Sequence, residues 1–126
     1  MFAERRATAM IPVSDLNRAK AWYADKLGLK PAKEWGDSGA EYELAGVHAY
    51  MYPTQYAGTA QHTILSFDAP DLLSDMKAMR EKGIVFLEYD QPGFKTVDGV
   101  AEFGEGKNAW CKDSEGNILG FVQGMG

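Results

Sequence analysis

The sequence predicts an α+β fold built from two βαβββ modules that pack together as one domain. A strand, a helix and three strands follow one another in the first half, and the same order begins again after residue 60. Internal repetition with a unit of about sixty residues indicates one supersecondary unit packed on its copy. Each helix would cover one face of its sheet, which leaves the other face to curve around a cavity.

The domain is expected to span residues 1–126, with modules at about 5–56 and 61–126. A chain of 126 residues can bury a core of its own, and it is too short for two ordinary domains. The two modules are therefore halves of one folding unit.

The first strand and helix follow from alternation and capping signals. Residues 7–13 form a strand because apolar and polar side chains alternate there. Ser14 or Asp15 can cap the helix that follows, since a side-chain oxygen accepts a free backbone N–H. That helix runs to about Leu27, and Gly28 ends it because glycine adopts the left-handed conformation at little cost.

The rest of the first module is predicted to be three strands. They cover about residues 31–35, 40–44 and 47–52. The Ala-Gly pair at 45–46 connects the last two as a tight hairpin. Residues 53–60 contain Pro, Thr and Gly and form a linker to the second module.

The second module begins with a strand at residues 61–68 and a helix that Pro70 and Asp71 open. Gly83 ends the helix, which gives the usual asymmetry of proline at the first turn and glycine after the last. Residues 84–88 are predicted to form the next strand.

A long polar stretch at 89–106 follows, and a loop of this length is typical of functional segments. Part of it, at about 100–103, is expected to be extended. Strands at 108–112 and 117–123 complete the module.

The composition excludes some classes of partner and compartment. Thirteen basic and eighteen acidic residues give a net charge of -5, which weighs against nucleic-acid binding because phosphate contacts need clustered Lys and Arg. Cys111 is the single cysteine, so no internal disulfide forms. No apolar run reaches membrane-spanning length and no secretory signal is evident. We expect a cytoplasmic protein that does not bind membranes.

Three sequence motifs carry a resemblance to a known family. They are Val-Ser-Asp-Leu at 13–16 with Trp22-Tyr23 and Leu-Gly-Leu at 27–29, a second copy at 67–72 with Lys-Gly-Ile at 82–84, and the closing turn Asp-Ser-Glu-Gly-Asn at 113–117. In this order the motifs resemble the vicinal oxygen chelate superfamily. That superfamily includes glyoxalase I, extradiol dioxygenases, fosfomycin-resistance enzymes and bleomycin-resistance proteins. The resemblance implies a cup-shaped mixed β-sheet in which ligands bind.

Enzymes of that superfamily hold a metal ion with one side chain from each of several strands. The resemblance places those positions at Thr8, Ile64, Gly120 and one of Tyr50, Met51 or Tyr52. None of these is a normal ligand for a divalent ion, and glycine has no side chain at all. We therefore expect no metal and no other cofactor.

His48 and His62 are the two histidines. Alternation from Ile64 places His62 on the concave face, and His48 lies two residues before Tyr50. As a pair they could recruit zinc; as ordinary hydrogen-bonded side chains they carry no function; and either one could contact a ligand.

With the cup kept and the metal lost, the concave face becomes an aromatic pocket for a small molecule. Trp35 and the loop around Phe94 and Phe103 are expected at its mouth. Aromatic faces and the negative net charge favour a cationic or planar aromatic ligand. The predicted ligand-binding residues are Thr8, Trp35, Tyr50, Tyr52, His62, Ile64, Trp110 and Gly120.

The resulting hypothesis is a metal-independent small-molecule binding protein, similar to the bleomycin-resistance branch. The first alternative is a metal-dependent lyase or dioxygenase with another ligand set, such as His48 and His62. The second is a non-catalytic interaction module that uses the fold as a scaffold. The resemblance implies a homodimer, with the cup either within one chain or completed across the dimer.

Overall fold

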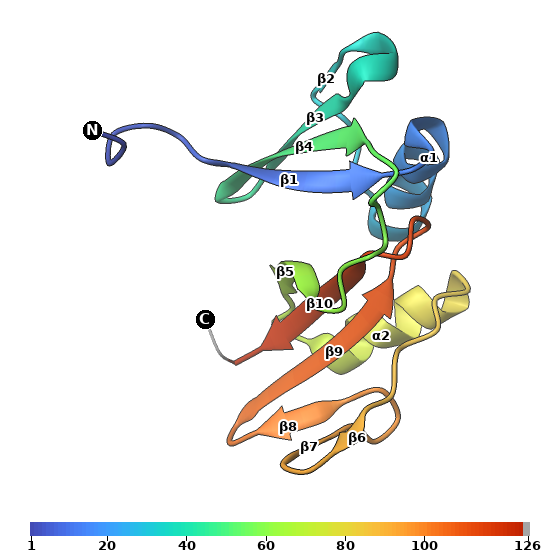
Figure 1. The fold of residues 1–126 in the computed structure, drawn as a ribbon. Coiled ribbons are helices and arrows are strands. Elements are labelled where there is room, and N and C mark those ends of the chain that lie inside the picture. The colour runs from blue at the N-terminus through green and yellow to red at the C-terminus, as the bar shows by residue number, and fades with distance from the viewer. Residues whose placement is uncertain (125–126) are drawn as a thin grey trace.

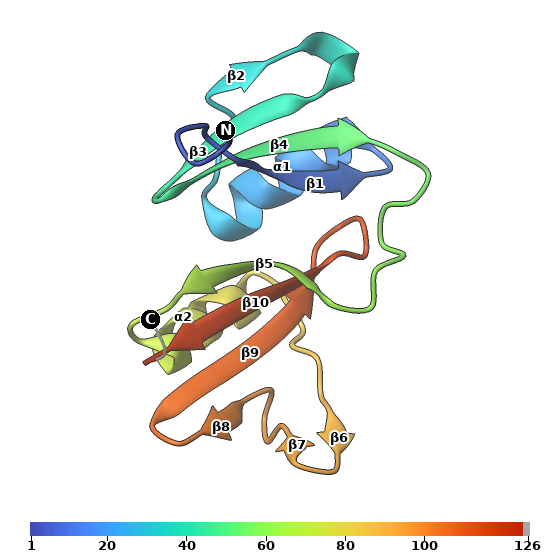
Figure 2. The same ribbon diagram turned by 60° about the vertical axis from the view of Figure 1, so that its left-hand side comes forward.

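The computed structural model describes residues 1–124 and shows the two predicted modules (Figures 1 and 2). The first module consists of β1 (Thr8–Val13), α1 (Leu16–Leu27), β2 (Lys33–Glu34), the short 3-10 helix η1 (Gly36–Ser38), β3 (Ala40–Leu44) and β4 (Val47–Pro53). The second consists of β5 (Thr63–Asp68), α2 (Leu72–Glu81), β6 (Asp90–Gln91), β7 (Phe94–Lys95), β8 (Ala101–Phe103), β9 (Gly106–Lys112) and β10 (Ile118–Gln123).

The two modules share one strand topology. The first sheet has the order β1-β4-β3-β2, and the second has the equivalent order β5-β10-β9-β8. In each sheet the first and last strands of the module run parallel, and the other neighbours run antiparallel. The predicted α+β fold with two repeated modules is therefore confirmed. Across residues 1–124 the ladders form two separate four-stranded sheets and a small β6-β7 hairpin.

Each helix covers one face of its sheet, as Figure 2 shows. Ile11 and Val13 of β1 are buried on the face that packs against Tyr23 of α1, whereas Met10 is 52% exposed on the other face. The helix ends also follow the prediction. Asp15, rather than Ser14, caps α1 by accepting a hydrogen bond from the Arg18 N–H at 3.0 Å. No helix within residues 1–124 is long and apolar enough to cross a lipid bilayer.

The prediction of a strand at 84–88 is wrong. Only Phe86 pairs there, through an isolated bridge to Cys111 of β9, and the Leu87 N–H donates to the Trp110 carbonyl at 2.8 Å. The segment touches the edge of β9 briefly because β8 pairs with the other end of the same edge. The extended stretch expected at 100–103 is confirmed as β8.

The closing turn at 113–117 locks the two modules together. Asp113 Oδ2 accepts a hydrogen bond from the buried Tyr23 hydroxyl at 2.6 Å, and Asn117 Nδ2 donates to the Pro12 carbonyl at 2.7 Å. Burial and the Asp113 carboxylate raise the pKa of Tyr23, which keeps its hydroxyl protonated as the donor.

Glu115 of the same turn also joins the modules, and its side chain is fully buried at the start of α1. Oε1 accepts the N–H groups of Ser14 and Asp15 at 2.9 and 2.8 Å, and Oε2 accepts Arg18 Nε at 2.9 Å. Burial alone would raise the pKa of Glu115, but the bonds from Arg18, Ser114, Asp15 and Ser14 outweigh it and lower the pKa to about 2. A carboxylate from the second module thus satisfies the helix N-terminus of the first.

Candidate functional site

The candidate site is a pocket of about 330 Å³ on the face of the second sheet that α2 leaves uncovered. Trp110 of β9 and Ile118 of β10 lie at its base. The linker before β5 forms one wall and the segment around β6 and β7 forms the other. The lining residues are Gln61, His62, Thr63, Tyr89, Gln91, Phe94, Trp110 and Ile118.

Aromatic rings from β9 and from the segment around β6 and β7 dominate one side of the pocket. Trp110 packs against Tyr89 with ring centroids 5.5 Å apart and against Phe94 at 5.2 Å. Tyr89 and Phe94 also contact each other at 5.2 Å, and Phe103 extends the cluster behind Phe94 at 5.9 Å. Tyr89 meets both Trp110 and Phe94 edge to face, which is a stable arrangement for aromatic pairs, and the other two pairs are tilted. A ligand in the pocket would lie against this cluster.

The segment that carries Tyr89 and Phe94 is held by a buried threonine and a carboxylate. Thr96 Oγ1 donates to Glu88 Oε1 at 2.7 Å, and the Gly99 N–H donates to the same oxygen at 2.7 Å. These two bonds lower the pKa of Glu88. The Asp98-Gly99 pair turns the chain with φ values of 53° and 80°, as a tight two-residue hairpin requires.

A second, more polar cavity of about 580 Å³ continues from the pocket and shares Gln61, Tyr89, Gln91 and Ile118 with it. It adds Glu88, whose carboxylate is already bonded, and Lys112. The combined cleft therefore offers aromatic faces, two amide side chains, an imidazole and one ammonium group. Such groups can stack on a flat molecule and hydrogen-bond to its edge.

The uncovered face of the first sheet has a different character. His48 is 8% exposed, and its Nδ1 lies 3.4 Å from Thr8 Oγ1. Its Nε2 lies 3.7 Å from Glu41 Oε1 and 3.5 Å from Glu43 Oε1. Tyr50 donates its hydroxyl to the Ser38 carbonyl at 3.3 Å. This face is polar and acidic.

Of the eight predicted ligand-binding residues, the pocket contains His62 and Trp110. Thr8, Tyr50 and Tyr52 lie on β1 and β4 in the first sheet, outside this pocket. Trp35 is 47% exposed and donates its indole N–H to Glu41 Oε2 at 3.1 Å, also outside the pocket. One chain thus carries the predicted concave surface as two separate halves.

Ile64 and Gly120 depart from the predicted geometry for local reasons. The β5-β10 register shifts between Ile118 and Leu119, so that Thr63 pairs with Ile118 while Leu65 pairs with Leu119. The resulting bulge breaks the alternation on which the placement of Ile64 rested, and Ile64 packs against the core cluster. The space above Gly120 is crowded, because a Cβ there would lie 3.2 Å from Ser66 Oγ and Thr63 Cγ2.

The residues at the family's metal positions do not fit a divalent ion. Thr8 Oγ1 is a neutral donor beside His48, Ile64 packs in the core, and Thr63 and Ser66 fill the space at Gly120. No group of three His, Cys, Asp or Glu side chains within residues 1–124 is arranged to hold a metal. Metal independence itself stays a prediction.

Sequence reasoning missed Tyr89, Gln61 and Gln91 as pocket residues. The Asp-Gly pair at 98–99 between two valines was the available signal, because it is a strong hairpin turn. It would have shown that the polar stretch folds back on itself. Cys111 is buried, and burial together with Asp113 raises the pKa of its thiol to about 12, which disfavours the reactive thiolate.

Comparison with known proteins agrees with the fold. The sequence profile described as the Glyoxalase/Bleomycin resistance protein/Dioxygenase superfamily matches residues 5–121. No curated protein matches the chain.

Several solved structures share the architecture at low sequence identity. A glyoxalase/bleomycin resistance protein/dioxygenase from Alicyclobacillus acidocaldarius has a TM-score of 0.71 at 17% identity, over 98% of this chain and 93% of that one. A lactoylglutathione lyase from Agrobacterium tumefaciens has a TM-score of 0.68 at 14% identity, over 97% and 96%.

A glyoxalase/bleomycin resistance protein from Catenulispora acidiphila has a TM-score of 0.63 at 20% identity, over 94% and 96%. At these identities the structures establish the fold alone. With a profile match over nearly the whole length, the chain belongs to the glyoxalase/bleomycin resistance protein/dioxygenase superfamily.

Proposed function

We propose that this protein binds a planar aromatic small molecule without a metal ion and without transforming it. One observation carries the proposal: Trp110, Tyr89 and Phe94 form a continuous aromatic wall in the pocket of the second sheet. Aromatic walls with a few polar groups are typical of small-molecule sites. The crowding of Gly120 by Thr63 and Ser66 supports the metal-free part of the proposal.

The polar groups of the pocket refine the expected ligand. Gln61 and Gln91 carry neutral amides, and His62 carries an imidazole. The carboxylate of Glu88, in the adjoining cavity, already accepts bonds from Thr96 and Gly99. This pocket therefore favours a flat heteroaromatic ring with hydrogen-bonding atoms on its edge over a simple cation. The acidic pair Glu41 and Glu43 beside His48 lies on the first sheet, outside this pocket.

We also propose that the protein acts as a homodimer in which a second copy covers the open half-cup. Within one chain the aromatic pocket lies on the second sheet, whereas Thr8, Tyr50 and His48 lie on the first. The first sheet's uncovered face also exposes Met10 by 52% and Trp35 by 47%. A composite cup would bury these side chains and bring an acidic wall opposite the aromatic one.

A thermal-shift screen of planar heteroaromatic compounds, each with and without EDTA, tests the proposal. We expect stabilising compounds whose effect EDTA does not change. For such a compound, Trp110→Ala should weaken binding by about 2 kcal/mol, roughly thirtyfold in Kd, because an aromatic anchor at the centre of a site carries much of its binding energy. Phe2→Ala is the matched control, since Phe2 is an exposed aromatic outside the site. Stabilisation that EDTA removes would contradict the proposal.

The alternative, a metal-dependent lyase or dioxygenase, has one observation in its favour. The His48 imidazole lies within 3.7 Å of carboxylate oxygens of Glu41 and Glu43. Imidazole and carboxylate are ligand types for several transition metals, but these three side chains would have to rearrange to hold an ion. Metal analysis of the purified protein distinguishes the two functions. One ion per subunit that disappears in His48→Ala would support the enzyme; a metal-free wild-type protein would remove it.

A further inference from the structure

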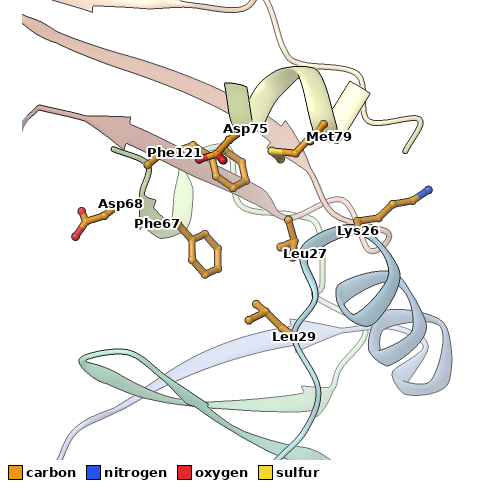
Figure 3. Close-up of a pocket in the computed structure, with 10 residues that line it drawn as sticks. Lys26, Leu27, Leu29, Phe67, Asp68, Asp75, Met79 and Phe121 are labelled. Carbon is orange, nitrogen blue, oxygen red and sulfur yellow. The ribbon is translucent and has the colours of Figure 1, made fainter. Parts of the chain in front are cut away.

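Another cavity lies between the two modules, separate from the aromatic pocket and from the polar cavity that adjoins it. It has a volume of about 260 Å³ and opens beside the end of α1, the start of β5 and one side of α2. Figure 3 shows Leu27 and Leu29 from the first module and Phe67 from the second pointing into the same space. Met79 and Phe121, which are 7% and 6% exposed, form its floor.

The apolar part of this cavity includes the partly exposed ring of Phe67. Phe67 stacks on Phe121 with ring centroids 5.8 Å apart and planes 16° from parallel. Phe121 is also packed edge to face by Phe86 on its inner side. Phe67 remains partly exposed on the cavity side. An apolar chain or ring placed there would bury surface against Phe67, Leu27 and Leu29.

The apolar surface continues beyond this cavity along β5. An adjoining cavity of about 400 Å³ shares Leu29, Phe67 and Asp68 with the first and adds Leu44, Val47 and Leu65. We call the two together the intermodule groove. Because the two cavities adjoin, the groove suits an extended apolar chain better than a compact molecule.

The rim of the groove is acidic. Asp68 and Asp75 line the first cavity and are both exposed. Within residues 1–124 neither carboxylate has a salt-bridge partner. Lys26 also lines the cavity, but its ammonium donates to the Lys82 carbonyl and lies 3.3 Å from Asp25 Oδ2. Lys26 keeps its positive charge but already pairs with Asp25, so the two free carboxylates of Asp68 and Asp75 outnumber it on this rim.

We propose that the intermodule groove binds a cationic amphiphile, with its apolar chain against Phe67 and Leu29 and its ammonium group near Asp68 and Asp75. Opposite charge at the rim and apolar surface below it match these two parts of such a molecule. The groove site is independent of the aromatic pocket.

Three eight-carbon compounds with the same chain test the charge requirement: octylammonium, octanoate and octanol. Binding is followed by NMR of methyl-labelled methionine, because Met79 lines the cavity. We expect octylammonium to shift the Met79 methyl signal and to bind about tenfold more tightly than octanoate, with octanol between them. Met79→Leu identifies the signal.

Two variants separate charge from shape. The double substitution Asp68→Asn with Asp75→Asn should weaken octylammonium about fivefold and leave octanol unchanged. Glu81→Gln is the control, an exposed acid on the same helix outside the cavity. Ala78→Phe places a ring in the cavity from an exposed position and should abolish binding of all three compounds.

Equal binding of octanoate and octylammonium, or an unchanged Met79 signal, would overturn the proposal. So would a dimer that Ala78→Phe dissociates, since a second copy would then occupy the groove. Trp110→Ala should leave octylammonium binding unchanged; a loss there would place the compound in the aromatic pocket instead. The groove and the aromatic pocket can therefore fail separately.

Discussion

The two modules have the same strand order but different uncovered faces. In the first, a short connection leads from α1 to β2, and the sheet face carries the polar group His48, Glu41 and Glu43. In the second, the segment between α2 and β8 is long and folds over the sheet edge. That segment places Tyr89 and Phe94 against Trp110.

This difference shows that the shared sheet topology alone does not form the binding pocket. The equivalent ladders β1-β4 and β5-β10 supply two similar platforms, and only the one with the longer connection acquires a wall. Binding residues concentrate on loops held by a rigid scaffold for this reason. Three experiments test how far the two modules are coupled and how far they differ.

The largest effect is expected from Glu115→Ala, which removes one of the side chains that join the modules. The substitution leaves the N–H groups of Ser14 and Asp15 and the Arg18 guanidinium without their acceptor. We expect the free energy of unfolding to fall by about 4 kcal/mol, measured by urea denaturation. Glu88→Ala is the control, because its carboxylate accepts bonds within one module. A loss no larger than that of the control would show that the turn does not couple the modules.

The next effect is a loss of stability in acid. The pKa of Glu115 is about 2 in the folded chain, below its ordinary value of 4.5. The unfolded state therefore takes up the proton first, and stability falls as the pH drops from about 4.5 towards 2, by about 3 kcal/mol in total. Urea denaturation at a series of pH values measures the slope. Glu115→Gln should flatten it, and an equally steep slope in that variant would assign the titration to other groups.

The smallest effect compares a turn glycine from each module. Gly99 has φ of +80°, and a Cβ there would lie 2.9 Å from Phe86 Cβ; Gly46 has φ of +83° with nothing within 4 Å. Gly99→Ala should cost about 2 kcal/mol and Gly46→Ala about 1 kcal/mol, because only the first adds a clash to the backbone strain. Gly99→Ala should also loosen the wall that carries Tyr89 and Phe94. Equal unfolding free energies for the two variants would show that a Cβ at position 99 does not clash with Phe86.

Local signals were sufficient to predict most of the fold. The Asp15 and Asp71 caps, the glycines after both helices and the hairpin at 45–46 are all found where the sequence placed them. These features depend on residues a few positions apart. The same holds for the extended stretch that became β8.

The site was harder to predict because it depends on distant contacts and on register. Tyr89 meets Trp110 only after the chain folds over β9, and no spacing in the sequence encodes that approach. The bulge between Thr63 and Leu65 shifts the alternation by one residue, so counting from Phe67 misplaced Ile64. No local pattern in the sequence could predict the role of Glu115 in joining the modules, since its partners lie about a hundred positions earlier in the chain.

The position of Glu115 also has a consequence for biosynthesis. A ribosome makes Ser14, Asp15 and Arg18 long before the turn at 113–117 that completes their hydrogen bonds. The N-terminal half of the chain thus emerges with the start of α1 open to solvent, and it stays so until residue 117 has left the exit tunnel. The first module is therefore less stable during translation than in the complete domain, because the hydrogen bonds to Glu115 form only after the turn at 113–117 is available.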